Sequence, residues 1–219
     1  MRLPRRVRAV VFDMDGLLVD TECVYRDAMI GEALAIGRPM PLPVFLSMVG
    51  LPKPESDKLA LDHFGDEAVT ERWRAGMALR VETALAAGVR LKPGAAELLD
   101  HLETAGVPRA IATSSGHAGV QAHLGPSGIL PRFQAVIARG DYARGKPHPD
   151  PFLTAAAALG VAPEHCLALE DSHNGVRAAS SAGMMTVMVP DLLDATDEMR
   201  SLCVTVRASL HEVLEGLRP

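Results

Sequence analysis

Short apolar runs alternate with longer amphipathic segments along most of this chain. The runs that indicate buried strands lie at 7–12, 109–112, 133–137, 166–169 and 185–189. Helical patterns separate or follow them, at 94–105, 117–124, 151–159 and beyond residue 171, with a tail formed by a short apolar run at 202–206 and a helical segment at 209–217. This alternation predicts an α/β fold whose core is a doubly wound, Rossmann-like parallel sheet.

The distance between the first two predicted strands indicates a second domain. A strand–helix–strand unit needs about 30 residues, yet the first strand ends at residue 12 and the next begins near residue 108. Helical patterns separated by glycine and proline fill the surplus, at 22–36, 41–48, 54–64 and 67–87. We therefore predict a core domain made of 1–19 and 90–219, with an inserted helical domain at 20–89.

Two pairs of acidic residues stand at the ends of predicted strands. Asp13 and Asp15 follow the first strand, and Glu170 and Asp171 follow the strand at 166–169. Neighbouring carboxylates in a buried position are costly, because they lose hydration and repel each other, so a cation or a catalytic role must offset the cost. An ordinary Asp-rich turn would explain the first pair alone. The second pair favours a functional site.

Basic and hydroxyl groups occur in equivalent places. Lys146 lies in a proline-rich loop, RGKPHPDPF, and Thr113, Ser114 and Ser115 follow the strand at 109–112, where we expect the next helix to start. Hydroxyls and backbone N–H groups at a helix start can bind phosphate. The carboxyl ends of parallel strands share the edge of a sheet where ligands bind. Together these groups indicate phosphoryl transfer assisted by Mg²⁺, which prefers oxygen ligands.

Four motifs that carry these residues occur in a recognisable order: DMDGLLVDTE, ATSSG, GKPHPDPF and EDSHNGVRAASSAGM. With them the chain resembles the haloacid dehalogenase superfamily of hydrolases, in its phosphatase and β-phosphoglucomutase branch. The resemblance covers the core from residue 7 to about residue 189. It implies that the inserted segment at 20–89 is a helical cap domain, which can exclude water and select the leaving group.

The resemblance also implies a role for each motif residue. Asp13 would be the nucleophile that becomes an aspartyl-phosphate, and Asp15 the general acid that then serves as the base. Mg²⁺ would be held by carboxylates and one backbone carbonyl, from Asp13, Asp15, Glu170 and Asp171. Lys146 would neutralise charge on the phosphoryl group. The groups expected to contact phosphate or substrate are Thr113, Ser114, Ser115 and, from a cap loop, Lys53, for which a solvated surface lysine is the alternative.

Three classes of function remain open. The first is a Mg²⁺-dependent phosphatase that acts on a small phosphorylated metabolite, a sugar phosphate or a phosphoglycolate-like compound. The second is a phosphomutase of the β-phosphoglucomutase type, although those mutases carry a cap histidine in the stretch occupied here by residues 24–26. The third is a non-enzymatic binding protein on the same fold, against which the intact motif residues argue. Asp15 argues against carbon–halogen cleavage, because dehalogenases of this superfamily lack it.

Composition narrows the setting. The 219 residues are 48% hydrophobic and 22% charged, as in ordinary soluble globular proteins, and the net charge of −5 gives no reason to expect nucleic-acid binding. No apolar stretch is long enough to span a membrane. The three cysteines lack a C-x-x-C spacing and are expected to be free thiols in a reducing cytoplasm. The eight histidines show no metal-ligand spacing, so we interpret them as surface or packing residues. We expect a monomer.

Overall fold

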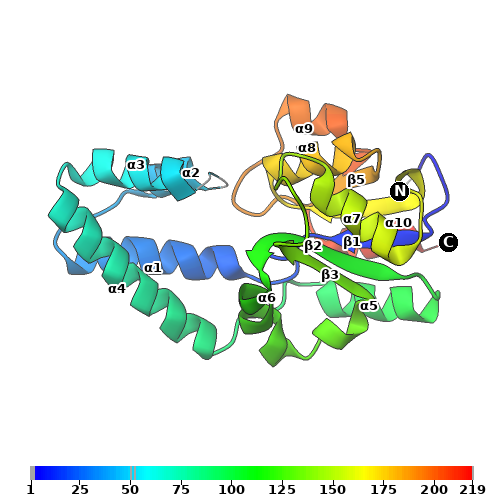
Figure 1. Ribbon diagram of the computed structural model, residues 1–219, viewed down its shortest axis with the longest axis horizontal. Coiled ribbons are helices and arrows are strands. Elements are labelled where there is room, and N and C mark those ends of the chain that lie inside the picture. Colours follow the sequence, from blue (N-terminus) through cyan, green and yellow to red (C-terminus); the bar gives the residue numbers. More distant parts are fainter. Residues whose placement is uncertain (1–2, 50, 52, 219) are drawn as a thin grey trace. The chain divides into compact units, whose positions relative to one another are not determined.

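The computed structural model describes residues 3–49, 51 and 53–218, so the extreme ends of the predicted core, at residues 1, 2 and 219, lie outside the described residues. The chain divides into two compact units (Figure 1). The core unit comprises Met1–Asp20 and Arg90–Pro219, and the helical unit comprises Thr21–Val89.

The described part of the core unit contains one six-stranded sheet in which all neighbouring strands are parallel. Its strands are β1 (Ala9–Phe12), β2 (Arg109–Gly116), β3 (Ala135–Arg139), β4 (Cys166–Glu170), β5 (Met185–Met188) and β6 (Thr205–Val206). Their order is β3-β2-β1-β4-β5-β6, so the chain winds outward from β1 to β3 and then crosses to β4 on the other side of β1. This arrangement confirms the predicted doubly wound α/β sheet.

Helices cover both faces of this sheet. They are α5 (Ala95–Thr104), α6 (His117–Leu124), α7 (Asp150–Leu159), α8 (His173–Ser181), α9 (Asp197–Leu202) and α10 (Leu210–Leu217), with 3₁₀ turns at Gly125–Ser127, Leu130–Arg132 and Pro163–His165. Alternate residues of β1 point to opposite faces. Ala9 and Val11 pack in a cluster with residues of α7 and α8, whereas Phe12 makes an edge contact with Phe133.

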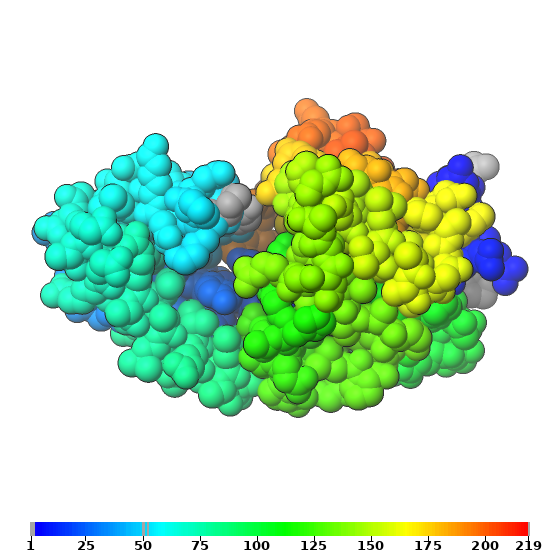
Figure 2. All heavy atoms as spheres, viewed as in Figure 1, coloured from blue at the N-terminus to red at the C-terminus, as the bar shows by residue number. Residues whose placement is uncertain are grey.

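The sheet is deeply buried because both faces carry helices. Every residue of β1 and of β4 is buried. In the space-filling view, the yellow-green atoms of the α7 segment form part of the visible surface of the core unit (Figure 2). Any carboxylate placed at the ends of these two strands is therefore held at the rim of a dry core.

The helical unit contains α1 (Thr21–Ala35), α2 (Leu42–Met48), α3 (Lys53–Phe64) and α4 (Glu67–Ala86). Its buried centre includes Trp73, whose indole N–H donates to the carbonyl of Met29 at 3.0 Å and whose ring contacts Phe64. The Asp66 side chain caps α4 by accepting from the backbone N–H of Val69. No helix in the described part of either unit combines the length and the apolar character that crossing a membrane requires.

Several predicted bounds need correction. The second strand does not end at residue 112 but continues to Gly116, and its pairing with β3 is irregular between Ala112 and Gly116. The tail also contains a helix, α9, that the apolar pattern does not indicate, because its three charged residues hide a short buried face around Met199. Thr196 caps that helix.

Candidate active site

Two central strands bring the predicted acidic residues together. β1 pairs with β4 so that Phe12 lies opposite Leu169, and the backbone N–H of Asp13 donates to the carbonyl of Leu169 at 2.9 Å. Asp13 therefore lies beside Glu170 at the carboxyl edge of the sheet. The strand order reverses between β1 and β4, and ligands of open α/β sheets bind at such a switch point.

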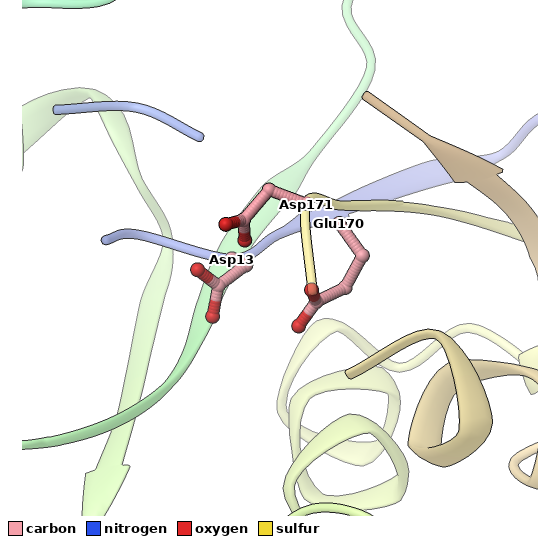
Figure 3. Close-up of side chains that lie close together, drawn as sticks. All are labelled: Asp13, Glu170 and Asp171. Carbon is pink, nitrogen blue, oxygen red and sulfur yellow. The ribbon is translucent and has the colours of Figure 1, made fainter. Parts of the chain in front are cut away.

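Three carboxylates gather at this edge. Asp13, Glu170 and Asp171 are all buried, and each offers an oxygen within 4.8 Å of those of the other two. Figure 3 shows the three side chains leaving the ends of two adjacent strands, with the carboxylates of Asp13 and Asp171 close together. The structure thus places these three predicted residues in one cluster.

Lys146 reaches the same cluster from the loop that precedes α7. Its ammonium donates to Asp13 and, at 2.6 Å, to Glu170, and it lies 5.0 Å from the centre of the Phe152 ring. Only 5% of its side chain is exposed. Removing one partner from a buried ion pair costs far more than removing an exposed one, because the remaining charge keeps its desolvation penalty.

The single positive charge of Lys146 does not balance three ionised carboxylates. Burial raises the pKa of the Asp13 carboxyl to about 8, and the charge of Lys146 offsets only part of that effect. For Lys146, burial disfavours the ammonium, but the two carboxylates outweigh it and hold the pKa above its usual range. Two buried carboxylates thus share one ammonium, with a third close by. A further cation would favour ionisation of Asp13.

Glu170 is held on both oxygens. While Oε1 accepts from Lys146, Oε2 accepts from the backbone N–H and the hydroxyl of Ser172, at 2.9 and 3.0 Å. Ser172 also caps α8, since its hydroxyl accepts from the N–H of Gly175 at 3.1 Å. Glu170 therefore fixes Lys146 and the start of α8 in one arrangement.

Gly175 leaves the space that this arrangement needs, and its replacement gives a stability test. A Cβ there would lie 1.6 Å from Oε1 of Glu170. We expect Gly175→Ala to lower the free energy of unfolding by more than about 2 kcal/mol, because neither the helix nor the paired carboxylate can yield. Denaturant unfolding followed by circular dichroism measures the change.

The matched control is Gly31→Ala in α1, where the nearest atom to an added Cβ is the end of the Arg80 side chain at 3.7 Å. Alanine favours a helix interior over glycine by up to about 1 kcal/mol, so this variant should be as stable as the parent or more so. Equal stabilities for the two variants would contradict the tight approach of Glu170 to α8.

Gly16 has a comparable role in the loop after β1. Its φ of +82° is a conformation that favours glycine, and a Cβ would lie 2.4 Å from Oδ2 of Asp171 and 3.4 Å from Oδ2 of Asp191. Asp191, which follows β5, is held by Lys92 at 2.6 Å. The sequence patterns predicted neither Lys92 nor Asp191 as a neighbour of this site.

The hydroxyl groups of the second motif are placed differently from the prediction. Thr113, Ser114 and Ser115 belong to the end of β2, and α6 begins only at His117, so they do not start a helix. Thr113 is buried; its hydroxyl accepts from the N–H of Ser115 at 3.0 Å and its carbonyl accepts from Tyr142 at 2.9 Å. Irregular pairing at this point lets β2 turn its side chains toward a site, as bulges near active sites do.

Asp15 is held by two residues from distant parts of the chain. The Ser115 hydroxyl donates to Oδ2 at 2.7 Å, and Nδ1 of His123 lies 2.8 Å from Oδ1. His123 is buried, which agrees with a packing role, but its contact with Asp15 was not predicted from the sequence. The buried face of α6, formed by Val120, His123 and Leu124, is the signal that could have identified it, because a buried imidazole needs a polar partner.

Lys53 belongs to the helical unit, at the first position of α3. Its side chain is 80% exposed and forms an ion pair with Asp57 at 2.7 Å, one turn along the same helix. This is the geometry of a solvated surface lysine, and a substrate contact by Lys53 stays a prediction.

The carboxylate cluster fits a hard divalent cation. It offers only oxygen ligands, its closest acceptors lie within 4.8 Å of one another, and its shared lysine leaves negative charge to be neutralised. Mg²⁺ is bound in proteins by one or two carboxylates, with water and substrate oxygens completing the shell. Asp13 and Asp171 suit this role best, because both oxygens of Glu170 already accept hydrogen bonds.

Comparisons with known proteins agree with this geometry. A family model described as haloacid dehalogenase-like hydrolase matches residues 7–183. A Drosophila melanogaster protein named probable pseudouridine-5'-phosphatase is 37% identical over 95% of this chain and 92% of its own. Two solved structures cover nearly all of the chain. One, provisionally described as a β-phosphoglucomutase from Thermotoga maritima, has a TM-score of 0.82 and 26% identity over 96% of this chain and 98% of its own. The other is CbbY from Rhodobacter sphaeroides in complex with xylulose-1,5-bisphosphate. It has a TM-score of 0.77 and 27% identity over 97% of this chain and 100% of its own.

Proposed function

Because the chain belongs to the haloacid dehalogenase-like hydrolases, we propose that it is a Mg²⁺-dependent phosphatase that acts through an aspartyl-phosphate on Asp13. The observation that carries this proposal is the buried cluster of side chains in which Asp13 lies beside Lys146, Glu170 and Asp171, at the switch point of the sheet. The named relatives of the chain include phosphatases, and the chain is a phosphoric monoester hydrolase.

In the first step, an oxygen of Asp13 attacks phosphorus and the bond to the leaving oxygen breaks. The leaving oxygen takes a proton from Asp15, so it departs as an alcohol. Lys146 balances charge on Asp13 and on the phosphoryl oxygens, while the Thr113 hydroxyl and the Ser114 backbone hold those oxygens. Asp13, Asp171 and the backbone carbonyl of Asp15 would hold a Mg²⁺ ion, which would supply positive charge to stabilise the phosphoryl group.

In the second step, Asp15 accepts a proton from water as the water oxygen attacks phosphorus. The bond between phosphorus and Asp13 breaks, and inorganic phosphate leaves. Splitting the reaction at a covalent intermediate replaces one difficult displacement with two easier ones. Asp15 returns to its protonated form, ready for the next cycle.

The substrate class follows from what two relatives are named for or bind. Pseudouridine 5′-phosphate and xylulose-1,5-bisphosphate both carry a phosphate ester on a primary carbon of a five-carbon sugar. The proposed substrate is therefore a pentose phosphate or nucleoside 5′-phosphate of this kind. Phosphoglycolate, which also carries its ester on a primary carbon, is the nearest non-sugar candidate. The helical unit would act as the cap that chooses among them.

The test is phosphate release from a panel of monoesters in the presence of Mg²⁺. The panel contains pseudouridine 5′-phosphate, xylulose 1,5-bisphosphate, ribose 5-phosphate, phosphoglycolate and β-glucose 1-phosphate. We expect a pentose ester to give the highest kcat/KM, and p-nitrophenyl phosphate to serve as a positive control for the chemistry. Failure of the pure, folded protein to release phosphate from any of these would overturn the proposal.

The same panel separates the phosphatase from a phosphomutase, the alternative supported by the likeness to the Thermotoga maritima structure. A mutase must protect its aspartyl-phosphate from water until a sugar hydroxyl recaptures the phosphoryl group. The family's cap histidine is missing from residues 24–26, so we expect β-glucose 1-phosphate and a bisphosphate primer to yield free phosphate with little glucose 6-phosphate. Efficient isomerisation without phosphate release would favour the mutase.

Removal of divalent metal should abolish turnover and lower stability. EDTA leaves the Asp13 and Glu170 carboxylates with one shared ammonium, so we expect activity to disappear and to return with Mg²⁺. Mg²⁺ binds only the folded cluster, and at one hundred times its Kd it should stabilise the fold by about 2.7 kcal/mol. Phosphate release and thermal unfolding measure the two effects. Full activity after exhaustive chelation would rule out the metal.

A further inference from the structure

Each oxygen of the Asp15 carboxylate lies within hydrogen-bond distance of a side chain more than ninety residues away in the sequence. Ser115 comes from the end of β2 and donates to Oδ2 at 2.7 Å. His123 comes from the last turn of α6 and meets Oδ1 through Nδ1 at 2.8 Å. All three residues lie in the core unit. A carboxylate held at both oxygens by separate elements cannot rotate about its side-chain bonds without breaking a contact.

The contact with His123 is more than an incidental surface interaction. The His123 side chain is only 6% exposed and the Asp15 side chain is 25% exposed, so water competes poorly for the imidazole. A buried polar side chain is costly unless it is hydrogen-bonded. The contact with Asp15 therefore offsets the cost of burying His123 on the apolar face of α6.

We propose that His123 and Ser115 are positioning residues that hold Asp15 in the orientation needed for proton transfer. This inference rests on the proposed function, in which Asp15 gives a proton to the leaving oxygen and later takes one from water. Both transfers require the same carboxyl group at hydrogen-bond distance from the reacting oxygen, and small misplacements of a catalytic group are costly. The Ser115 hydroxyl can donate or accept, so its contact can persist whether Asp15 is ionised or protonated. Ser115 thereby serves Asp15, and its predicted contact with phosphate stays a prediction.

A double-mutant cycle tests whether His123 acts through Asp15. We expect His123→Leu to lower kcat by about 10- to 100-fold with little change in KM, since general acid–base catalysis contributes about 10² to 10⁴. In the Asp15→Asn background the same change should cost less than about twofold, because there is no acid left to orient. Ser115→Ala should show the same dependence on Asp15.

Two further variants separate positioning from folding. His123→Asn keeps a side-chain N–H near the place of Nδ1 and should recover most of the activity lost in His123→Leu. His117→Leu, on the same helix, is the matched control: that ring is 61% exposed and contacts Asp141 rather than Asp15. It should behave like the parent enzyme. Thermal unfolding of each variant shows which ones are folded. If His123→Leu does not fold, the kcat values of Ser115→Ala and His123→Asn test the positioning role instead.

Leaving-group dependence gives a readout that a structural role would not change. In single-turnover experiments, His123→Leu should slow the first step strongly with ribose 5-phosphate, whose sugar oxygen needs a proton. It should slow that step far less with p-nitrophenyl phosphate, whose leaving group departs without one. An equal loss for both substrates would indicate a general structural defect and overturn the inference.

The remaining outcomes are equally decisive. A higher kcat in His123→Leu would mean that the contact with His123 holds Asp15 away from the substrate. An unchanged kcat in His123→Leu, or losses in kcat that simply add in the double-mutant cycle, would mean that His123 does not act through Asp15. Either result overturns the inference while the phosphatase stands. A parent enzyme without phosphatase activity, or an Asp13→Asn variant that retains it, would overturn the proposed function and this inference with it.

Discussion

Asp13→Asn should abolish phosphate release, with kcat reduced by about 10⁴ or more, because the proposed reaction cannot form its covalent intermediate without that carboxylate. The fold should survive. Asparagine has nearly the same shape, and the change removes one of two buried carboxylates that share Lys146. We expect the variant to unfold in EDTA at the same temperature as the parent or a higher one, and to gain less stability from Mg²⁺.

The control is Asp100→Asn on α5, an equivalent change at a carboxylate whose side chain is 70% exposed and paired with Arg132. Exposed ion pairs contribute little, so both activity and stability should stay close to those of the parent. Activity above about one per cent in Asp13→Asn would contradict the nucleophile assignment. Mass spectrometry must first exclude conversion of the new asparagine back to aspartate.

The sequence was sufficient to predict the sheet and the acidic cluster because both follow from local patterns. Apolar runs of strand length that end in Asp13 or Glu170 place those residues at the carboxyl edge wherever parallel strands pair. The motif resemblance then indicated Lys146, which joins the two carboxylates. These predictions needed no knowledge of which helix packs on which face.

The residues that the sequence did not reveal depend on contacts between distant elements. His123 meets Asp15 only because α6 packs beside the end of β2, and the side-chain pattern of α6 shows a buried face without showing what lies opposite. The direction of Ser115 depends on the irregular end of β2, which reads in sequence as the start of a helix. Substrate contacts proposed for the helical unit leave no comparable pattern, and the contact by Lys53 stays a prediction.

Lys146→Met should cost both activity and stability, and the loss of stability should grow with pH. Removing the ammonium leaves Asp13 and Glu170 buried without their shared partner, which typically costs about 3–5 kcal/mol. Burial already raises the pKa of Asp13 to about 8, and Lys146 is the main group that lowers it. Without Lys146 the carboxyl should hold its proton to higher pH.

The sign of the pH effect follows from proton binding. A carboxyl group that binds its proton more tightly in the folded state than in the unfolded state makes stability fall as pH rises through the interval between the two pKa values. In the parent that interval for Asp13 ends near pH 8, and in Lys146→Met it extends further. In EDTA, the difference in thermal unfolding between parent and variant should therefore be larger at pH 9 than at pH 6.

The matched control is Lys58→Met, which replaces an exposed lysine on α3 and should leave the stability unchanged at both pH 6 and pH 9. In activity, Lys146→Met should lose at least about 10²-fold in kcat, the scale seen when one charge-stabilising group is removed from an active site. Mg²⁺ should restore part of the stability, because a divalent cation also neutralises Asp13, but not the activity. Equal stabilities of the Lys146→Met variant and the parent at pH 9 in EDTA would show that the two carboxylates do not depend on Lys146, and would remove the electrostatic argument for the metal.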